Sequence, residues 1–307
     1  MASDKFRLIT RSDFDGLVCA VLLKERGLID DILFVHPKDM QDRKIPVSAR
    51  DISTNLPYVP GIHLAFDHHL SETMRNEHHD NHVIDPNAPS AARVVFDHYG
   101  GKAAFPRISD EMMAAVDKGD SAQFTVDEVL HPQGWVLLNF LMDARTGLGR
   151  FRTFRVGNYQ LMMDLIDYCK NHGIEEILAL PDVRERVDLY LEHDARAKEQ
   201  IRRCTTVKGK TAVLDLRGEE TIWATNRFMI YALFPETSLS IHVMWGRDKQ
   251  NTVLAIGKSI IDRSSSANVG EICMKRGGGG HMAAGTCQIE NDRAGTVLAE
   301  ILAEVGG

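Results

Sequence analysis

The sequence predicts an α/β protein with an N-terminal parallel-sheet domain, a helical connector and a smaller C-terminal α+β domain. Near the N-terminus, short apolar segments alternate with a segment of helical spacing, an order typical of parallel sheets. From about Pro132 to Thr205, apolar residues recur every three to four positions among many charges, which indicates helices. Strand-like segments return from Val207. We therefore expect domains at 1–130, 131–205 and 206–307.

The first domain should place polar residues along one edge of its sheet. Its helix is expected at Gly16–Arg26, and its strands at Phe6–Thr10, Ile32–His36 and Ile62–Phe66. Ligands of open parallel sheets bind at the carboxyl ends of the strands. Asp13, Asp51 and Asp67 each lie at or shortly after a strand-like or turn-rich segment, so we expect them to converge.

The C-terminal domain should contain a small sheet flanked by two helices. Its strands are expected at Thr211–Leu216, Ser238–Trp245 and Thr252–Ile260. The second and third are joined by a hairpin-like loop, Gly246–Asn251. The helices are expected at Trp223–Phe234 and Arg293–Glu304.

The amino-acid composition limits the classes of substrate and the cellular compartment that we expect. Acidic residues outnumber basic ones by 43 to 36, for a formal charge of −7, which favours a small phosphorylated substrate over long nucleic acid. No run of eighteen apolar residues or signal-peptide stretch occurs, so no membrane association is expected. The five cysteines lack CxxC spacing, which suits reduced thiols in the cytoplasm. The oligomeric state is left open, with a homodimer as one candidate.

Three acidic stretches carry possible metal ligands. They are Thr-Arg-Ser-Asp13-Phe-Asp15-Gly16, Asp51 in ARDISTNLPY, and Phe-Asp67-His68-His69. Mn²⁺ accepts carboxylates together with imidazole, whereas Mg²⁺ prefers oxygen ligands, so we expect Mn²⁺ with Mg²⁺ as the alternative. Each stretch alone is also compatible with an ordinary turn or a solvated loop.

The order of these motifs resembles the DHH phosphoesterase family, which includes RecJ-type exonucleases, nanoRNases, cyclic-dinucleotide phosphodiesterases and manganese pyrophosphatases. The family's fourth motif would lie in AVDKGDSAQF, where Asp120 is preferred to Asp117. The resemblance implies that Asp51 bridges two metals and that His69 positions the phosphate or a ligand. The metal ligands it implies are Asp13, Asp15, Asp51, Asp67, His68 and Asp120.

A glycine run near the C-terminus predicts a phosphate-binding segment. In Lys275-Arg276-Gly277-Gly278-Gly279-Gly280-His281, backbone N–H groups are unobstructed by side chains, and His281 adds a donor. The run resembles the substrate-binding motif of the DHH-associated C-terminal domain, which commonly has an Arg-Ser pair upstream, here Arg263-Ser264. The alternatives are a flexible linker for the glycines and a solvated loop for Arg263.

The chain departs from the family pattern at Arg11. Close relatives typically have a histidine ligand at this position, and a guanidinium cannot ligate a cation. We therefore expect one well-occupied metal held by Asp15, Asp51, His68 and Asp120, a weak site beside Asp13, and modest activity. Catalytic roles are expected for His68, His69 and Arg11. The alternative is that Arg11 points away and pairs with a surface acid.

These features predict a phosphoesterase in which metal-activated water attacks a small phosphorylated substrate. The candidates are a short oligonucleotide, a cyclic dinucleotide, phosphoadenosine phosphate and polyphosphate. The helical middle resembles an exopolyphosphatase-related, nanoRNase-like branch. One alternative is a non-catalytic nucleotide or phosphate sensor with a degraded metal site. An exonuclease acting on long strands is disfavoured by the negative charge.

Overall fold

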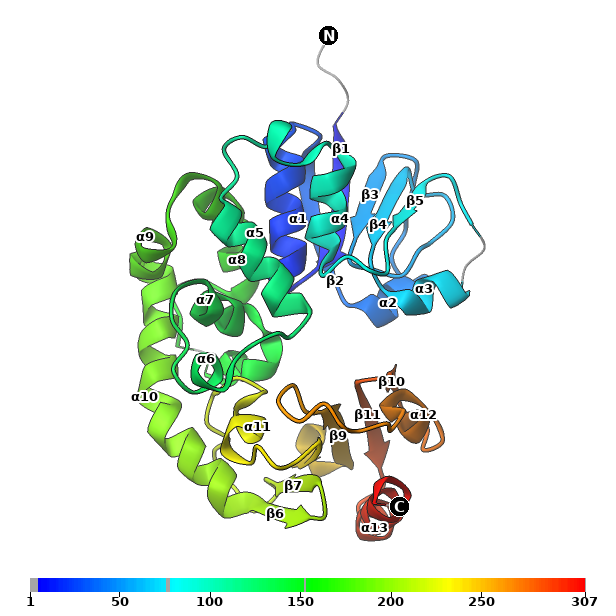
Figure 1. Cartoon of the computed structure of the whole chain (residues 1–307), viewed down its shortest axis with the longest axis vertical. Helices are drawn as coiled ribbons and strands as arrows, with labels where there is room; N and C mark the ends of the chain where they lie inside the picture. Colours follow the sequence, from blue (N-terminus) through cyan, green and yellow to red (C-terminus); the bar gives the residue numbers. More distant parts are fainter. Residues whose placement is uncertain (1–4, 76–77, 152, 307) are drawn as a thin grey trace. The chain divides into compact units, whose positions relative to one another are not determined.

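The computed structural model describes residues 5–75, 78–151 and 153–306 (Figure 1). They form two compact units. The first comprises Met1–Gln123, Gln133–Ala144 and Leu148–Asp188, and the second Phe124–Pro132, Arg145–Gly147 and Leu189–Gly307. None of the helices in the described ranges is both long and apolar enough to cross a membrane.

The first unit contains a five-stranded parallel sheet in the order β2-β1-β3-β4-β5. The strands are β1 (Phe6–Arg11), β2 (Ile29–Val35), β3 (Asp51–Thr54), β4 (Leu64–Asp67) and β5 (His82–Ile84). The parallel sheet is confirmed, and β1, β2 and β4 correspond to the three expected strands. Strands β3 and β5 were not anticipated, because four and three residues are too few to show a periodic pattern.

Helix α1 (Phe14–Glu25) begins almost directly after β1 and is buried on every side from Phe14 to Leu23. It packs against α4 (Ala91–His98), α5 (Asp110–Asp120) and α8 (Asn158–Asn171), and Figure 1 shows α1 and α4 side by side. A helix covered all round needs apolar residues all round, as its sequence shows. The other helices of this unit are α2 (Pro37–Gln41), α3 (Leu70–Arg75), α7 (Gly134–Met142) and α9 (Ile174–Ala179).

The second unit contains a mixed six-stranded sheet in the order β10-β11-β9-β8-β7-β6, in which only the β7–β8 pair is parallel. Its strands are β6 (Thr205–Lys208), β7 (Thr211–Asp215), β8 (Leu239–Trp245), β9 (Thr252–Lys258), β10 (Gly279–His281) and β11 (Ala284–Ile289). Its helices are α6 (Val126–Leu130), α11 (Met229–Leu233), α12 (Val269–Met274) and α13 (Ala294–Val305). Apolar residues of β8 and β9 pack with α12 and α13 in one core.

The segment 131–205 is helical, as expected. Its helices α7, α8 and α9 fall within the first unit, while α10 (Pro181–Cys204) begins in the first unit and continues into the second. The structure therefore groups this segment with its neighbours in the two units. Our division into a catalytic domain at 1–130, a helical connector at 131–205 and a C-terminal domain at 206–307 stays a prediction.

The helix expected at Trp223–Phe234 is shorter than predicted, because only Met229–Leu233 is helical. Buried Asn226 explains the difference. Its Nδ2 donates to the carbonyl oxygen of Val129 at 3.0 Å and to the hydroxyl of Tyr190 at 2.9 Å. Its Oδ1 accepts the backbone N–H of Phe228. These bonds hold an extended turn where the apolar spacing suggested a helix.

Candidate metal centre and phosphate-binding residues

The turn between β1 and α1 presents two aspartates at the carboxyl end of β1. Asp13 caps α1, because its Oδ1 accepts the backbone N–H of Gly16 at 3.0 Å. Asp15 lies in the first turn of α1 and is 2% exposed. Its carboxylate accepts the backbone N–H groups of Ala91 at 3.0 Å and Ala92 at 2.8 Å, at the start of α4. The Asp-x-Asp-Gly stretch thus orients one carboxylate into the interior of the unit.

The carboxyl end of β4 supplies the Asp-His-His stretch. Buried Asp67 ends the strand, and its Oδ1 lies 2.7 Å from Nδ1 of His69. Its Oδ1 also accepts the backbone N–H of His68 at 2.8 Å. Nδ1 of His68 lies 3.1 Å from the carbonyl oxygen of Ala88, so that nitrogen carries the proton. Nε2 of His68 is thereby left to face the site.

The last residue of α5, Asp120, completes the group. Its Oδ2 lies 2.9 Å from Nε2 of His68. Asp117, one turn earlier, is occupied elsewhere: its Oδ1 accepts the hydroxyl of Ser90 at 2.7 Å, and its Oδ2 accepts Nε of Arg93 at 3.0 Å. Asp120, which the sequence analysis preferred to Asp117, is thus the residue whose carboxylate lies against His68.

Asp15, His68 and Asp120 offer three ligand atoms that all lie within 4.8 Å of one another. Burial and the charge of Asp120 raise the pKa of Asp15. Burial opposes the charged form of His68, but the hydrogen bond and charge of Asp120 outweigh it and raise the pKa of His68 to about 9. Burial likewise opposes ionisation of Asp120, yet His68 holds its pKa below the usual value. The buried carboxylate of Asp15 and the half-buried carboxylate of Asp120 share one imidazole, and this donor set fits a divalent cation, which can take the place of the shared proton.

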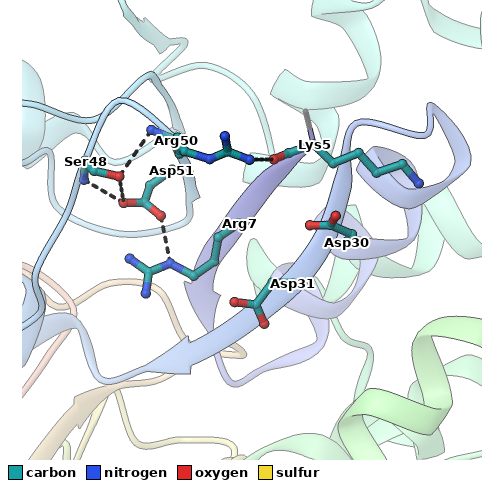
Figure 2. A pocket seen from close by; sticks show the side chains of 7 residues that line it. All are labelled: Lys5, Arg7, Asp30, Asp31, Ser48, Arg50 and Asp51. Carbon is teal, nitrogen blue, oxygen red and sulfur yellow. Dashed lines mark hydrogen bonds and ion pairs between the residues drawn. The ribbon is translucent and has the colours of Figure 1, made fainter. Parts of the chain in front are cut away.

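Asp51 does not join this group, which corrects the expectation that it bridges two metals. It begins β3, where the parallel register pairs it with Arg7 near the start of β1, at the opposite edge of the sheet. Figure 2 shows its carboxylate in a pocket with Arg7, whose Nε donates to it at 2.7 Å, and with Ser48. Asp51 therefore lies at the amino end of β3 and not at the carboxyl edge of the sheet, where we expected it.

The carboxyl end of β3 is followed instead by Asn55, a residue missed in the sequence analysis. Its backbone N–H donates to the carbonyl oxygen of Phe66, which fixes it beside the end of β4. Its Nδ2 donates to Oδ1 of Asp13 at 3.2 Å. No apolar pattern marked this position, because β3 (Asp-Ile-Ser-Thr) contains a single apolar residue.

Arg11, the last residue of β1, turns toward the acidic residues. Its Nε lies 2.9 Å from Oδ2 of Asp13. Burial raises the pKa of Asp120, but His68 and His69 lower it, and the positive charge of Arg11 adds a smaller lowering effect. Arg11 therefore places a fixed cation beside Asp13, within electrostatic reach of Asp120.

The glycine run of the second unit includes an edge strand where we expected a phosphate-binding loop. Residues Gly279–His281 form β10, which pairs with β11 alone at the end of the sheet. A Cβ on Gly278 would lie 2.1 Å from the carbonyl oxygen of Thr286, and one on Gly280 would lie 2.4 Å from that of Ala284. No atom lies within 4 Å of a Cβ on Gly279. Packing thus requires two of these glycines, and the third borders open space.

The Arg-Ser pair lies on an exposed turn after β9. Nε of Arg263 donates to the carbonyl oxygen of Ile260 at 3.2 Å. The backbone N–H of Ser264 donates to Oδ1 of Asp262 at 2.9 Å, and the hydroxyl of Ser264 lies 3.4 Å from Nζ of Lys210. Several polar donors therefore gather on this turn, and their role in binding stays a prediction.

Comparison with known proteins places this geometry in a family. No family model matches the chain, and no match was found among curated proteins. PggH, a pGpG-specific phosphodiesterase from Vibrio cholerae, shares 62% sequence identity at a TM-score of 0.86, covering 98% of this chain and 99% of PggH. RecJ from Thermus thermophilus in complex with Mn²⁺ has a TM-score of 0.54 at 13% identity, covering 98% of this chain and 52% of RecJ, which shows a shared fold. The chain belongs to the DHH family of phosphoesterases.

Proposed function

We propose that this chain is a metal-dependent phosphodiesterase whose substrate is pGpG or a closely related linear dinucleotide. The observation that carries the proposal is the 62% identity to a pGpG-specific phosphodiesterase over 98% of the chain. The formal charge of −7 favours a short substrate of this kind over a long strand. Among the substrates that the sequence left open, the linear dinucleotide is the one this relative supports.

The metal would be held by Asp15, His68 and Asp120. Their donor set of two carboxylates and one imidazole suits Mn²⁺, with Mg²⁺ as a poorer substitute. A bound divalent ion lowers the pKa of a coordinated water and so supplies a nucleophile near neutral pH. The hydrogen bonds from α4 to Asp15 and from His68 to Ala88 hold two of the three ligands in position without the metal.

Neighbouring side chains would act on the phosphate. Burial opposes the charged form of His69, but the hydrogen bond and charge of Asp67 outweigh it and raise the pKa of His69. Asp67 thus fixes the ring of His69, and the raised pKa favours the protonated form, which can donate to a phosphate oxygen. Arg11, fixed by Asp13, supplies a second donor. Hydrolysis adds water across the internal phosphodiester and releases two GMP molecules from pGpG.

Residues of the second unit would bind a phosphate group of the substrate. We assign this role to Gly278, Gly279, Gly280 and His281, with Arg263 and Ser264. The support is the exposed edge position of β10 and the open space at Gly279, where a ligand can approach the backbone closely. We also propose a cytoplasmic location, which the five free cysteines favour.

The test is hydrolysis of pGpG with Mn²⁺, followed by separation of the nucleotide products. The panel should include a cyclic dinucleotide, phosphoadenosine phosphate and polyphosphate. We expect conversion of pGpG to GMP and loss of at least about 100-fold in kcat/KM for Asp120→Asn. Asp110→Asn, on the same helix but with a side chain that is 81% exposed, is the matched control and should retain full activity. Binding of pGpG without turnover would instead favour the sensor alternative.

A further inference from the structure

The position that follows β3 is occupied by an amide. Asn55 is 1% exposed and has a φ of 55°, a left-handed conformation that asparagine tolerates better than most residues. Parallel strands β1 and β4 flank β3, so Asn55 lies on the edge that also carries Asp13 and Asp67. A neutral polar side chain therefore stands at the centre of this edge.

Asp13 is already engaged on both of its oxygens. Oδ1 accepts the backbone N–H of Gly16 at 3.0 Å and Nδ2 of Asn55 at 3.2 Å. Oδ2 lies 2.9 Å from Nε of Arg11. A cation that used Asp13 would have to displace these donors and would face a guanidinium that stays protonated. Asp13 therefore serves as an anchor for Arg11 and Asn55.

Two buried acceptors of this edge lack hydrogen-bond partners within the described part of the chain. They are Oδ1 of Asn55 and Oδ2 of Asp67. Both residues are 1% exposed, and an unpaired buried oxygen is unfavourable unless a cation or an ordered water meets it. Since Nδ2 of Asn55 is directed to Asp13, its Oδ1 is the oxygen that Asn55 can offer to a metal ion.

We propose that the site binds one divalent ion per chain, held by Asp15, His68 and Asp120 with Oδ1 of Asn55. Arg11, anchored on Asp13, then provides the second positive charge to the substrate phosphate. The inference rests on the proposed function, because it assigns the phosphate as the partner of Arg11. The rest of the Arg11 guanidinium can donate to phosphate oxygens, since its side chain is 32% exposed.

The first test counts metal ions without any substrate. The protein is loaded with Mn²⁺ and dialysed, and its manganese is measured by elemental analysis and by electron paramagnetic resonance. We expect one Mn²⁺ per chain with an uncoupled signal. Arg11→His combined with Asn55→Asp should bind two, with a spin-coupled signal, because it supplies an imidazole and a carboxylate in place of a guanidinium and an amide. Two tightly bound ions in the unmutated protein would overturn the inference.

The matched control for the metal count is Asp51→Asn, at the opposite edge of the sheet. It should still bind one ion, and a loss of the ion there would mean that Asp51 is a ligand and Asn55 is not. If the double variant fails to fold, the single variant Asn55→Ala tests whether Asn55 is a metal ligand. That variant should weaken Mn²⁺ binding at least about tenfold, since it removes one ligand. Unchanged Mn²⁺ affinity in folded Asn55→Ala would exclude Asn55 as a ligand.

The second test separates the role of Arg11 from a structural one. Arg11→Ala should lower kcat/KM for pGpG about 100-fold, and Arg11→Lys about tenfold, while Mn²⁺ affinity is unchanged or higher. Equal loss in both variants, or parallel loss of Mn²⁺ affinity, would contradict the role. A protein that binds one ion but does not hydrolyse pGpG would refute the proposed function and leave the metal count standing.

Discussion

Nε2 of His68 lies 2.9 Å from Oδ2 of Asp120, while Nδ1 of the same ring lies 3.1 Å from the carbonyl oxygen of Ala88. Both ring nitrogens thus face acceptor oxygens, and both can form hydrogen bonds only when both carry a proton. The raised pKa of His68, about 9, has this cause: burial opposes the charge, and the hydrogen bond to Asp120 overcomes it. In the metal-free protein, a proton therefore occupies a point where a cation can bind.

Binding of Mn²⁺ should tighten as the pH rises. The metal requires His68 to be neutral and Asp15 to be ionised. Burial and the charge of Asp120 raise the pKa of Asp15. Burial lowers the pKa of His68, but Asp120 outweighs burial and raises it. Below the pKa of His68, about 9, each binding event should release at least one proton. Affinity should then rise about tenfold per pH unit for each proton released.

Titration calorimetry in buffers of different ionisation enthalpy measures this proton release. His68→Gln, which keeps a polar side chain without a titrating ring, should bind more weakly and release about one proton fewer. Affinity of the unmutated protein that does not change with pH would contradict the assignment of His68 as a ligand.

Replacing Asp51 should reduce stability and leave catalysis intact. Its carboxylate accepts Nε of Arg7 at 2.7 Å and both the backbone N–H and the hydroxyl of Ser48. Asp51→Asn should lower the free energy of unfolding by about 1–3 kcal/mol, because Arg7 and Ser48 lose the charged partner that accepts their hydrogen bonds. KM and kcat for pGpG should stay within about twofold of the unmutated values.

The difference in unfolding free energy between the unmutated protein and Asp51→Asn should be larger at neutral pH than in acid. Although burial opposes ionisation, Arg7 and Ser48 hold the pKa of Asp51 below its ordinary value of 3.8. The stabilisation is therefore present above 3.8 and lost as the pH falls through the lower pKa of the folded state. Urea unfolding at several pH values should show a difference that is full at neutral pH and shrinks in acid.

Residues adjacent to long, well-patterned elements could be placed from the sequence. Asp15 and His68 follow strands whose apolar residues stand out, and the spacing placed both beside a carboxyl end. Asp51 was misplaced because β3 has only four residues and itself begins with the acid, so no pattern showed which end of the strand it occupied. Asp120 was preferred to Asp117 from the family resemblance alone, and the bonds of Asp117 to Ser90 and Arg93 are tertiary contacts that the sequence does not reveal.

The glycine run shows a different limit. Its composition indicated backbone close to a ligand, but β10 also needs glycine to pair with β11. Sequence alone does not tell a glycine required by packing from one required by a ligand. Only the position of neighbouring atoms distinguishes Gly278 from Gly279.

Gly16→Ala should severely destabilise the first unit. A Cβ at this position would lie 2.0 Å from the carbonyl oxygen of Arg11, so α1 could not keep its close approach to the end of β1. We expect a loss of about 3 kcal/mol or more, measured by thermal and urea unfolding. Gly295→Ala is the matched control, since Gly295 is an exposed residue of α13 with no atom within 4 Å of an added Cβ. The control should be neutral or stabilising by up to about 1 kcal/mol, and equal effects of the two changes would contradict the packing argument.

Gly279→Val should weaken substrate binding without harming the fold. No atom lies within 4 Å of a Cβ at Gly279, and β-branched residues suit an edge strand. A side chain there would obstruct only an incoming ligand. We expect KM for pGpG to rise at least about tenfold, with an unchanged melting temperature and unchanged Mn²⁺ binding.

Two further glycines separate binding from folding in this test. Gly278→Ala should unfold the second unit or lower its melting temperature strongly, because its Cβ would lie 2.1 Å from the carbonyl oxygen of Thr286. Gly218→Ala, also without an atom within 4 Å, should change neither stability nor KM, since we assign it no contact with substrate. If Gly279→Val retained the KM of the unmutated protein, β10 would not bind the substrate, and the open space at Gly279 would have no role in recognition.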